Sequence, residues 1–257
     1  MSDEWDFYFA SVNDAVASIF VDLGIRPDAP VEKRPWLLWV WVDLKAPRPD
    51  GLSSNEEAPR LHEIGAALDA MVSPVCGAQL VGRITGANRR EFYFYASEPG
   101  EFDAAVARAM NGFPEYKHES GSTFQPDWEQ YLELLYPSDS NLQRMFNRRV
   151  LESLAKNGDV HDIPRKVEHW LEFPSVETRT ACRGALEAID YVYEDEFLAE
   201  EPDEMFPHTL VVSRVDAVDS HTINGITLDL ARLAAEHEGR YDGWESAVVK
   251  AQGETTH

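Results

Sequence analysis

The sequence predicts an α+β protein of two ferredoxin-like sandwich domains, the first of them extended by an N-terminal β-hairpin. The 257-residue chain exceeds the common size of a single domain, so two domains are expected. The polar, turn-rich segment 137–141 is the best boundary, which places the domains at residues 1–138 and 141–257. In each half the strand and helix patterns follow the order β-α-β-β-α-β, which is that of the ferredoxin-like sandwich.

The first half contains the patterns of six strands and two helices. The strands are expected at residues 5–9, 17–22, 36–44, 78–85, 90–96 and 116–123. The helices follow two apolar stripes: Leu61, Ile64, Leu68 and Met71, then Phe102, Val106 and Met110. Asn13-Asp14 and Gly86-Ala87-Asn88 have the composition of hairpin turns. Pro74 is expected to close the first helix, and a Trp/Tyr-rich segment at 126–137 follows the last strand.

The second half begins with a helix at residues 142–154, which Asn157-Gly158 ends. Four strands are expected at 166–173, 191–197, 208–215 and 241–249, and two further helices at 175–189 and 227–238. Ser175 has the side chain of an N-cap, and Gly239 is expected to cap the last helix.

The formal net charge of −23 is the strongest signal in the composition. It is spread evenly, with −12 on residues 1–140 and −11 on residues 141–257. A negatively charged surface repels the phosphate backbone of DNA and RNA, which disfavours direct nucleic-acid binding. The same surface attracts basic, Arg-rich proteins. The alternative interpretation is that the acidity serves only solubility.

An acidic run at residues 194–204 is the first candidate for partner binding. It contains no Lys or Arg, and its acids are Glu194, Asp195, Glu196, Glu200, Glu201, Asp203 and Glu204. A run of this kind is either a solvated hairpin loop or a docking surface that forms carboxylate–guanidinium pairs with an Arg-rich segment.

The segment 239–245, Gly-Arg-Tyr-Asp-Gly-Trp-Glu, is the second candidate. In one interpretation it is structural: Asp242-Gly243 bends or bulges the strand and Trp244 fills the core. In the other, Tyr241, Asp242 and Trp244 contribute to a partner-binding surface, because Tyr and Trp dominate the hot spots of interfaces.

Known catalytic and metal-binding motifs are missing from the chain, so we expect no catalytic residues, metal ligands or cofactor. The histidines of the second half lack the spacing of a metal site; they are His161, His169, His208, His221 and His237. Arg83, Arg89 and Arg90 either neutralise neighbouring acids or form a small anion-binding spot. No apolar run approaches the length of a membrane span, no secretory signal is present, and a cytoplasmic location is expected.

Residues 141–250 contain four distinctive passages: 151–159 (LESLAKNGD), 164–170 (PRKVEHW), 210–214 (LVVSR) and 239–245 (GRYDGWE). Through these passages the second half resembles the RraB-like family, the regulators of ribonuclease E activity. The resemblance implies a ferredoxin-like fold and a protein partner, ribonuclease E or a related enzyme. Residues 1–138 resemble the family called domain of unknown function 695, through passages such as 4–8 (EWDFY), 81–85 (VGRIT) and 90–95 (REFYFY). That family implies no activity.

The leading hypothesis is a non-catalytic regulator, similar to an inhibitor, which docks on a basic protein of RNA decay through its acidic second domain. Two alternatives remain. One is an enzyme or small-ligand-binding protein with a pocket between the domains or on a sheet, motivated by the aromatic residues around 36–41 and 92–95. The other is a nucleic-acid mimic that occupies a basic channel.

Overall fold

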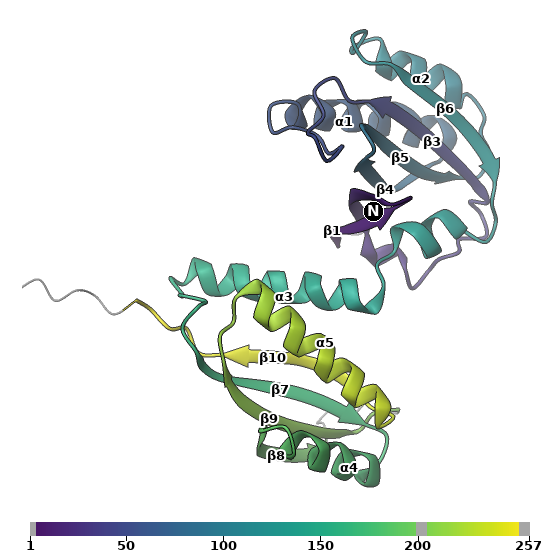
Figure 1. Cartoon of the computed structure of the whole chain (residues 1–257). Coiled ribbons are helices and arrows are strands. Elements are labelled where there is room, and N and C mark those ends of the chain that lie inside the picture. Colours follow the sequence, from purple (N-terminus) through teal and green to yellow (C-terminus); the bar gives the residue numbers. More distant parts are fainter. Residues whose placement is uncertain (1–3, 199–204, 252–257) are drawn as a thin grey trace, which may run out of the picture. The chain divides into compact units, whose positions relative to one another are not determined.

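The computed structural model of the chain describes residues 4–198 and 205–251 (Figure 1). It divides into two compact units, Met1–Ser138 and Asp139–His257, and each is described by itself below. In both units helices cover one face of an antiparallel sheet, so the predicted α+β class is confirmed.

The first unit is a six-stranded sheet in the order β1-β2-β4-β5-β3-β6. Its elements are β1 (Trp5–Val12), β2 (Ala15–Asp22), the 3₁₀ turn η1 (Leu23–Ile25), β3 (Trp36–Asp43), α1 (Ala58–Cys76), β4 (Gln79–Gly86), β5 (Arg89–Ala96), α2 (Phe102–Met110), β6 (His118–Phe124) and the π-helical turn η2 (Gln130–Leu135). Without the β1–β2 hairpin, the order β4-β5-β3-β6 is that of the ferredoxin-like sandwich. The predicted N-terminal hairpin is present, and its strand β2 pairs with β4.

Two-residue turns close both hairpins of this unit. Asn13 and Asp14 have φ angles of 50° and 63°, and Ala87 and Asn88 have φ angles of 48° and 64°. Two successive positive φ angles are the signature of a type I′ turn, whose twist matches that of the flanking strands.

The core of the first unit lies between α1, α2 and the sheet. Leu61, Ile64, Leu68 and Val72 of α1 pack against the strands, whereas Met71, predicted to belong to this stripe, is 41% exposed. The expectation that Pro74 closes α1 is wrong. The helix continues to Cys76 and ends at Gly77, which has a φ of 56°, because a proline one turn from the end removes a single N–H donor.

The opposite face of the first sheet is covered in part by residues 126–136. Trp128 stacks on Tyr95 with 4.0 Å between the ring centroids, and Leu135 lies against Gly82. Trp39 and Trp41 lie on this same face, half-buried, with their rings 4.5 Å apart. The Trp/Tyr-rich segment is therefore a second layer of the first unit.

The second unit has a four-stranded sheet in the order β10-β7-β9-β8, again the ferredoxin-like order. Its elements are α3 (Asp139–Lys156), β7 (Arg165–Phe173), α4 (Val176–Glu187), β8 (Val192–Leu198), β9 (His208–Asp216), α5 (Ser220–Glu236) and β10 (Arg240–Ser246). As expected, Ser175 caps α4, and Gly158, with a φ of 81°, follows α3.

Two boundaries in the second unit differ from the prediction. Helix α5 begins at Ser220, seven residues before the predicted start at Thr227. The side chain of Asp219 accepts the N–H groups of His221 and Thr222 and is the N-cap, and the buried Ile223 and Ile226 extend the apolar stripe of the helix toward it. Strand β10 ends at Ser246, three residues before the expected end.

The core of the second unit forms two adjoining clusters. One joins the sheet to α4 and α5 around Leu171, Phe173 and Leu210. The other joins α3 to β7 and β10 around Leu151, Val167 and Trp244. None of the helices in the described ranges is both long and apolar enough to cross a membrane.

Candidate functional site

The predicted acidic residues that the structure describes lie on β8, an edge strand of the second sheet. Among the described strands β8 pairs only with β9, so one backbone edge of β8 remains open to a further strand. The register shifts between Tyr193 and Asp195, which makes Glu194 the bulged residue. The other predicted acids lie outside the described residues: Glu200, Glu201, Asp203 and Glu204.

The carboxylate of Glu194 already interacts with neighbouring side chains. Ser213 donates a hydrogen bond to Oε1 at 2.6 Å, and Nζ of Lys166 lies 2.9 Å from Oε2. These hydrogen bonds from Ser213 and Lys166 hold the pKa of Glu194 below its ordinary value. The negative charge of Glu194 is therefore compensated within the domain.

Glu196 connects β8 to helix α4. Its two carboxylate oxygens each lie 3.2 Å from a guanidinium nitrogen, one of Arg179 and one of Arg183. The side chain of Arg179 is only 8% exposed, so Glu196 supplies the counter-charge that a nearly buried guanidinium requires. Replacing Glu196 would therefore disturb the fold as well as the surface charge.

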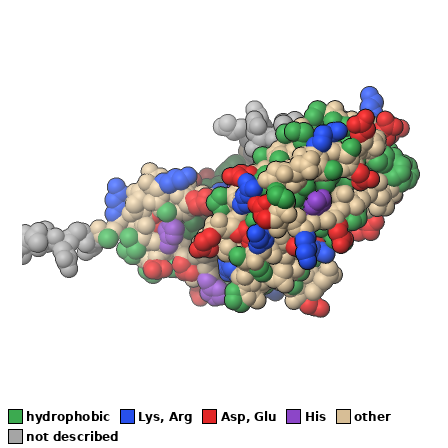
Figure 2. Space-filling model, turned by 90° about the horizontal axis from the view of Figure 1, so that it is seen from above, with side chains coloured by type: hydrophobic (Ala, Val, Ile, Leu, Met, Phe, Trp, Pro, Cys, Tyr) green, Lys and Arg blue, Asp and Glu red, His purple; other side chains and the backbone are tan. Residues whose placement is uncertain are grey.

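Asp195 differs from its two neighbours. It is exposed, and its Oδ1 accepts the backbone N–H of Glu196 at 2.8 Å. Among the described residues it forms no ion pair. On the face drawn in Figure 2, acidic and basic side chains are interspersed and do not form a purely acidic patch.

Apolar side chains occupy much of the same strand. Four of them are exposed by 39% to 63%: Val192, Tyr193, Phe197 and Leu198. Together with Asp195 they form what we call the β8 edge surface. An exposed apolar edge strand is a site at which another chain can bind.

The second predicted segment lies at the opposite edge of the sheet, on β10. As predicted, the strand bulges between Tyr241 and Gly243. Of the two interpretations of Trp244, the structure agrees with the one in which it fills the core and corrects the one in which it is an exposed anchor: it is 5% exposed and its indole N–H donates to Asn147 Oδ1 at 2.8 Å. Gly239 is not a left-handed cap either, because Glu238 has the positive φ, at 62°.

Tyr241 and Asp242 line a groove of about 620 Å³ between α3, α5 and β10. Asp242 is exposed and Tyr241 is half-buried. Apolar side chains form much of the groove: Leu142, Phe146, Leu228, Ala231 and Ala235. Those predicted partner-binding residues that the structure describes thus divide between two edges of one sheet and do not form a single surface.

The hydroxyl of Tyr241 lies in the core, 2.9 Å from Nδ1 of His169. Burial, with a contribution from the charge of Arg214, lowers the pKa of His169 to about 3. An imidazole of this pKa stays neutral near pH 7 and is a poor general base there. No group of three or more His, Cys, Asp and Glu residues in the described ranges is placed to hold a metal ion.

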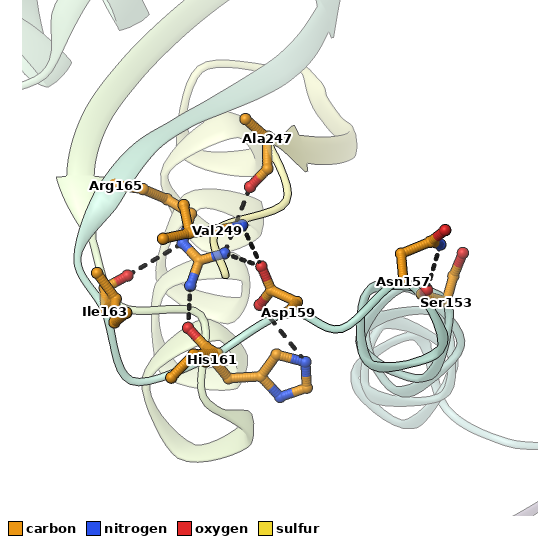
Figure 3. A network of polar contacts seen from close by, with 9 residues as sticks. Ser153, Asn157, Asp159, His161, Ile163, Arg165, Ala247 and Val249 are labelled. Carbon is orange, nitrogen blue, oxygen red and sulfur yellow. Dashed lines mark hydrogen bonds and ion pairs between the residues drawn. The ribbon is translucent and has the colours of Figure 1, made fainter. Parts of the chain in front are cut away.

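Asp159 and Arg165, one from each of the first two passages that carry the family resemblance, belong to a polar network (Figure 3). The carboxylate of Asp159 binds the guanidinium of Arg165 and accepts the N–H of Val249 at 2.6 Å. Arg165 also donates to the carbonyls of Ile163 and Ala247, at 3.0 and 3.3 Å. This network attaches the segment after β10 to the loop between α3 and β7, so these motif residues stabilise the fold.

The arginines of the first unit have different partners. Arg89 pairs with Glu91 and lies 4.0 Å above the ring of Trp41, so it neutralises an acid as one interpretation predicted. A groove of about 560 Å³ lies beside Trp41 and Arg89. Arg83 and Arg90 lie on the helix-covered face of the sheet. The three arginines form one group in the sequence-based prediction. The signal that separates them is the alternation along β5, which places Arg89 and Arg90 on opposite faces.

Comparisons with known proteins give the family of each unit. The family model described as "Family of unknown function (DUF695)" matches residues 3–136, and the model described as "Regulator of ribonuclease activity B" matches residues 144–246. Among curated proteins no match is found.

Two crystal structures are weakly similar to the chain. One is of an unknown protein from Galdieria sulphuraria, with 12% identity, 83% of this chain and 99% of that chain covered, and a TM-score of 0.23. The other is of a putative glycine cleavage system transcriptional repressor, with 9% identity, 82% and 98% covered, and a TM-score of 0.24. Such low TM-scores carry no argument about fold or function.

The family matches agree with the order of the two units along the chain. The first match covers more than half of the sequence, and the second covers the four-stranded unit with the Asp159 and His169 networks. The chain therefore belongs to the DUF695 family and carries, after that domain, a domain of the RraB family of regulators of ribonuclease activity.

Proposed function

We propose that this protein is a non-catalytic regulator that binds a ribonuclease of the E type through its RraB domain and restrains RNA cleavage. The observation that carries the proposal is the match of residues 144–246 to the regulators of ribonuclease activity. The neutral, buried His169 is consistent with a binding role. The proposal places the protein in the cytoplasm, together with the RNA-cleaving enzyme.

The β8 edge surface is the proposed docking site. Lys166, Arg179 and Arg183 compensate Glu194 and Glu196, so these acids contribute little net charge to an interface. The binding energy comes instead from the apolar side chains and from the open backbone edge, which a strand of the partner can extend.

Charge has a second, weaker role in this proposal. Asp195 and the net charge of −23 attract a basic partner from a distance and raise the association rate. The effect weakens with salt, because the surface charges are screened.

The test is a binding and inhibition assay of the full chain with the ribonuclease E of the same organism. Phe197 and Phe146 offer a matched pair, because their side chains are 42% and 41% exposed and lie on opposite edges of the second unit. Phe197→Asp should weaken binding by about tenfold or more, as for an interface anchor, while Phe146→Asp should leave the affinity unchanged. Equal affinities for the two variants would refute the β8 surface, and absence of both binding and inhibition would refute regulation itself.

A nucleic-acid mimic is the second candidate, and the even distribution of the negative charge favours it. A mimic occupies the RNA channel and competes with RNA at one shared site, whereas an edge-docking regulator binds with RNA present. Titration of the complex with a non-cleavable RNA separates the two: release of the protein indicates the mimic.

A further inference from the structure

Two arginines and a histidine meet on the helix-covered face of the first unit. Arg83 on β4 lies opposite Phe92, and Thr85 on β4 lies opposite Arg90 on β5. Residues opposite each other share a face, and so do residues two apart on one strand, so Arg83 and Arg90 are diagonal neighbours. His62 of α1 completes the group, with Nε2 3.4 Å from Nη2 of Arg83.

The two guanidinium groups have no carboxylate within ion-pair distance among the described residues. Arg90 is 5% exposed; its Nε donates to Thr85 Oγ1 at 2.8 Å, and its Nη1 has no hydrogen-bond partner in the described ranges. A buried cation without a partner is unfavourable. It is more so beside a second cation.

Besides Arg83, the ionisable groups that influence Arg90 are Glu57 and Tyr116. The carboxylate of Glu57 accepts the N–H groups of Lys45 and Ala46 at 2.8 and 3.0 Å and forms no ion pair with Arg90 among the described residues. Its negative charge favours the charged form of Arg90 but does not offset burial and the charge of Arg83, because the pKa of Arg90 is still lowered.

The electrostatics of the three groups agree with the geometry. Burial and the charge of Arg83 lower the pKa of Arg90 to about 10. Burial and the charges of Arg83 and Arg90 lower the pKa of His62. Both shifts have the direction that burial and a neighbouring positive charge produce, and an anion bound between the arginines would oppose each of them.

Aromatic surface adjoins the pair. The guanidinium of Arg83 lies 4.3 Å above the ring of Phe20, which stacks on Trp5 at 5.0 Å. The Phe20 ring fixes the Arg83 guanidinium in place, which lowers the entropy lost when it binds a ligand. Both rings are half-buried, so part of this ring pair remains accessible to a ring attached to the anion.

We propose that Arg83, Arg90 and His62 form an oxyanion-binding site of the DUF695 domain, with the phosphate group of a small molecule as the ligand. Guanidinium groups bind phosphate oxygens through paired, charge-assisted hydrogen bonds, and a protonated His62 adds a donor. All three residues belong to the DUF695 domain, so this proposal can be tested independently of ribonuclease binding by the RraB domain.

Calorimetric titration of the full chain with inorganic phosphate and with adenosine monophosphate tests this site. Arg83→Gln should weaken binding of both by about tenfold, the loss expected for one charged hydrogen-bonding group. Arg48→Gln is the matched control, since Arg48 is an exposed arginine of the same unit paired with Asp50, and it should bind as the native protein does. Adenosine monophosphate binding more tightly than phosphate, with the gain lost in Trp5→Ala, would extend the site to the Phe20–Trp5 pair.

A second measurement keeps the test valid if Arg83→Gln folds poorly. The His62 ring signals in NMR titrations should show a higher pKa with phosphate than without it, because the anion neutralises both arginines. Binding of neither probe, equal binding by Arg83→Gln and native protein, or an unchanged pKa of His62 on saturation would each overturn the proposal.

Discussion

In the second unit, Nδ1 of His169 lies 2.9 Å from the phenolic oxygen of Tyr241, between the sheet and the helices. His169 is fully buried, and its Nε2 has no hydrogen-bond partner within the described residues. The ring of Tyr191 lies 5.9 Å away, and the guanidinium of Arg214 lies 4.4 Å above that ring. An imidazole in this environment, with a cation nearby, is held in its neutral form.

This burial makes the second unit sensitive to acid. The pKa of His169 is about 3 in the folded state against 6.5 for the free side chain, so the unfolded chain takes up the proton first as the pH falls. Stability should therefore decrease below about pH 6.5, by roughly 1.4 kcal/mol per pH unit. Urea unfolding followed by the NMR signals of β7 measures this, at about pH 7 and about pH 5.

His169→Gln is the informative variant, because glutamine can still bond to Tyr241 and does not titrate. The loss of stability between the two pH values should be smaller in this variant than in the native protein, by about 2 kcal/mol. An identical pH dependence of the two proteins would show that His169 is not the group responsible.

The Asp159–Arg165 pair predicts a large and local effect on stability. Its side chains are 0% and 5% exposed, so Asp159→Asn leaves a buried guanidinium without its counter-charge. The free energy of unfolding of the second unit should fall by about 3–5 kcal/mol. The exposed pair Asp229–Arg232 on α5 is the control: Asp229→Asn should change stability by less than about 0.5 kcal/mol. Similar effects of the two substitutions would contradict the network of Figure 3.

Trp244→Phe separates the structural interpretation of the 239–245 segment from the binding interpretation. It removes the N–H donor to Asn147, which is itself 0% exposed, and should destabilise the second unit by about 2 kcal/mol. The affinity for the ribonuclease should not change. A variant with native stability and weakened binding would restore Trp244 as a partner-binding residue.

Two glycines of the second unit should respond in opposite directions to alanine. A Cβ at Gly239 would lie 2.4 Å from the Phe173 ring and 2.7 Å from the carbonyl oxygen of Glu172, so Gly239→Ala should cost about 1–3 kcal/mol. Gly184 is inside α4 and a Cβ there meets nothing within 4 Å, so Gly184→Ala should stabilise by about 0.5–1 kcal/mol. Thermal unfolding of both variants checks the pair, and a stabilising Gly239→Ala would contradict the close approach.

Much of the fold follows from local patterns in the chain. The alternation of residues 166–173 predicted β7, and the apolar run around Leu38 and Val40 predicted the central strand β3. Two differences have separate causes. Helix α5 begins earlier than predicted because Asp219 caps it through two hydrogen bonds to the backbone and Ile223 and Ile226 extend its apolar stripe. The burial of Val72 in place of Met71 depends on the rotation of α1 over the sheet.

The charge state of the candidate sites could not be predicted from the sequence. The run 194–204 has no basic residue, yet Lys166, Arg179 and Arg183 reach Glu194 and Glu196 in the folded domain. Arg83, Arg89 and Arg90 formed one group in the sequence. The fold separates Arg89, which pairs with Glu91, from the two arginines of the opposite face.

The sequence by itself determined the number of domains, the order of their elements and the family of each, because periodicity, capping and turn chemistry act between residues close in the chain. Only the tertiary structure decided which charges are compensated, that His169 is neutral, and that Trp244 is core. The reason is that desolvation and Coulomb energies depend on distances through space, and those distances join residues as far apart as His169 and Tyr241, 72 positions along the chain.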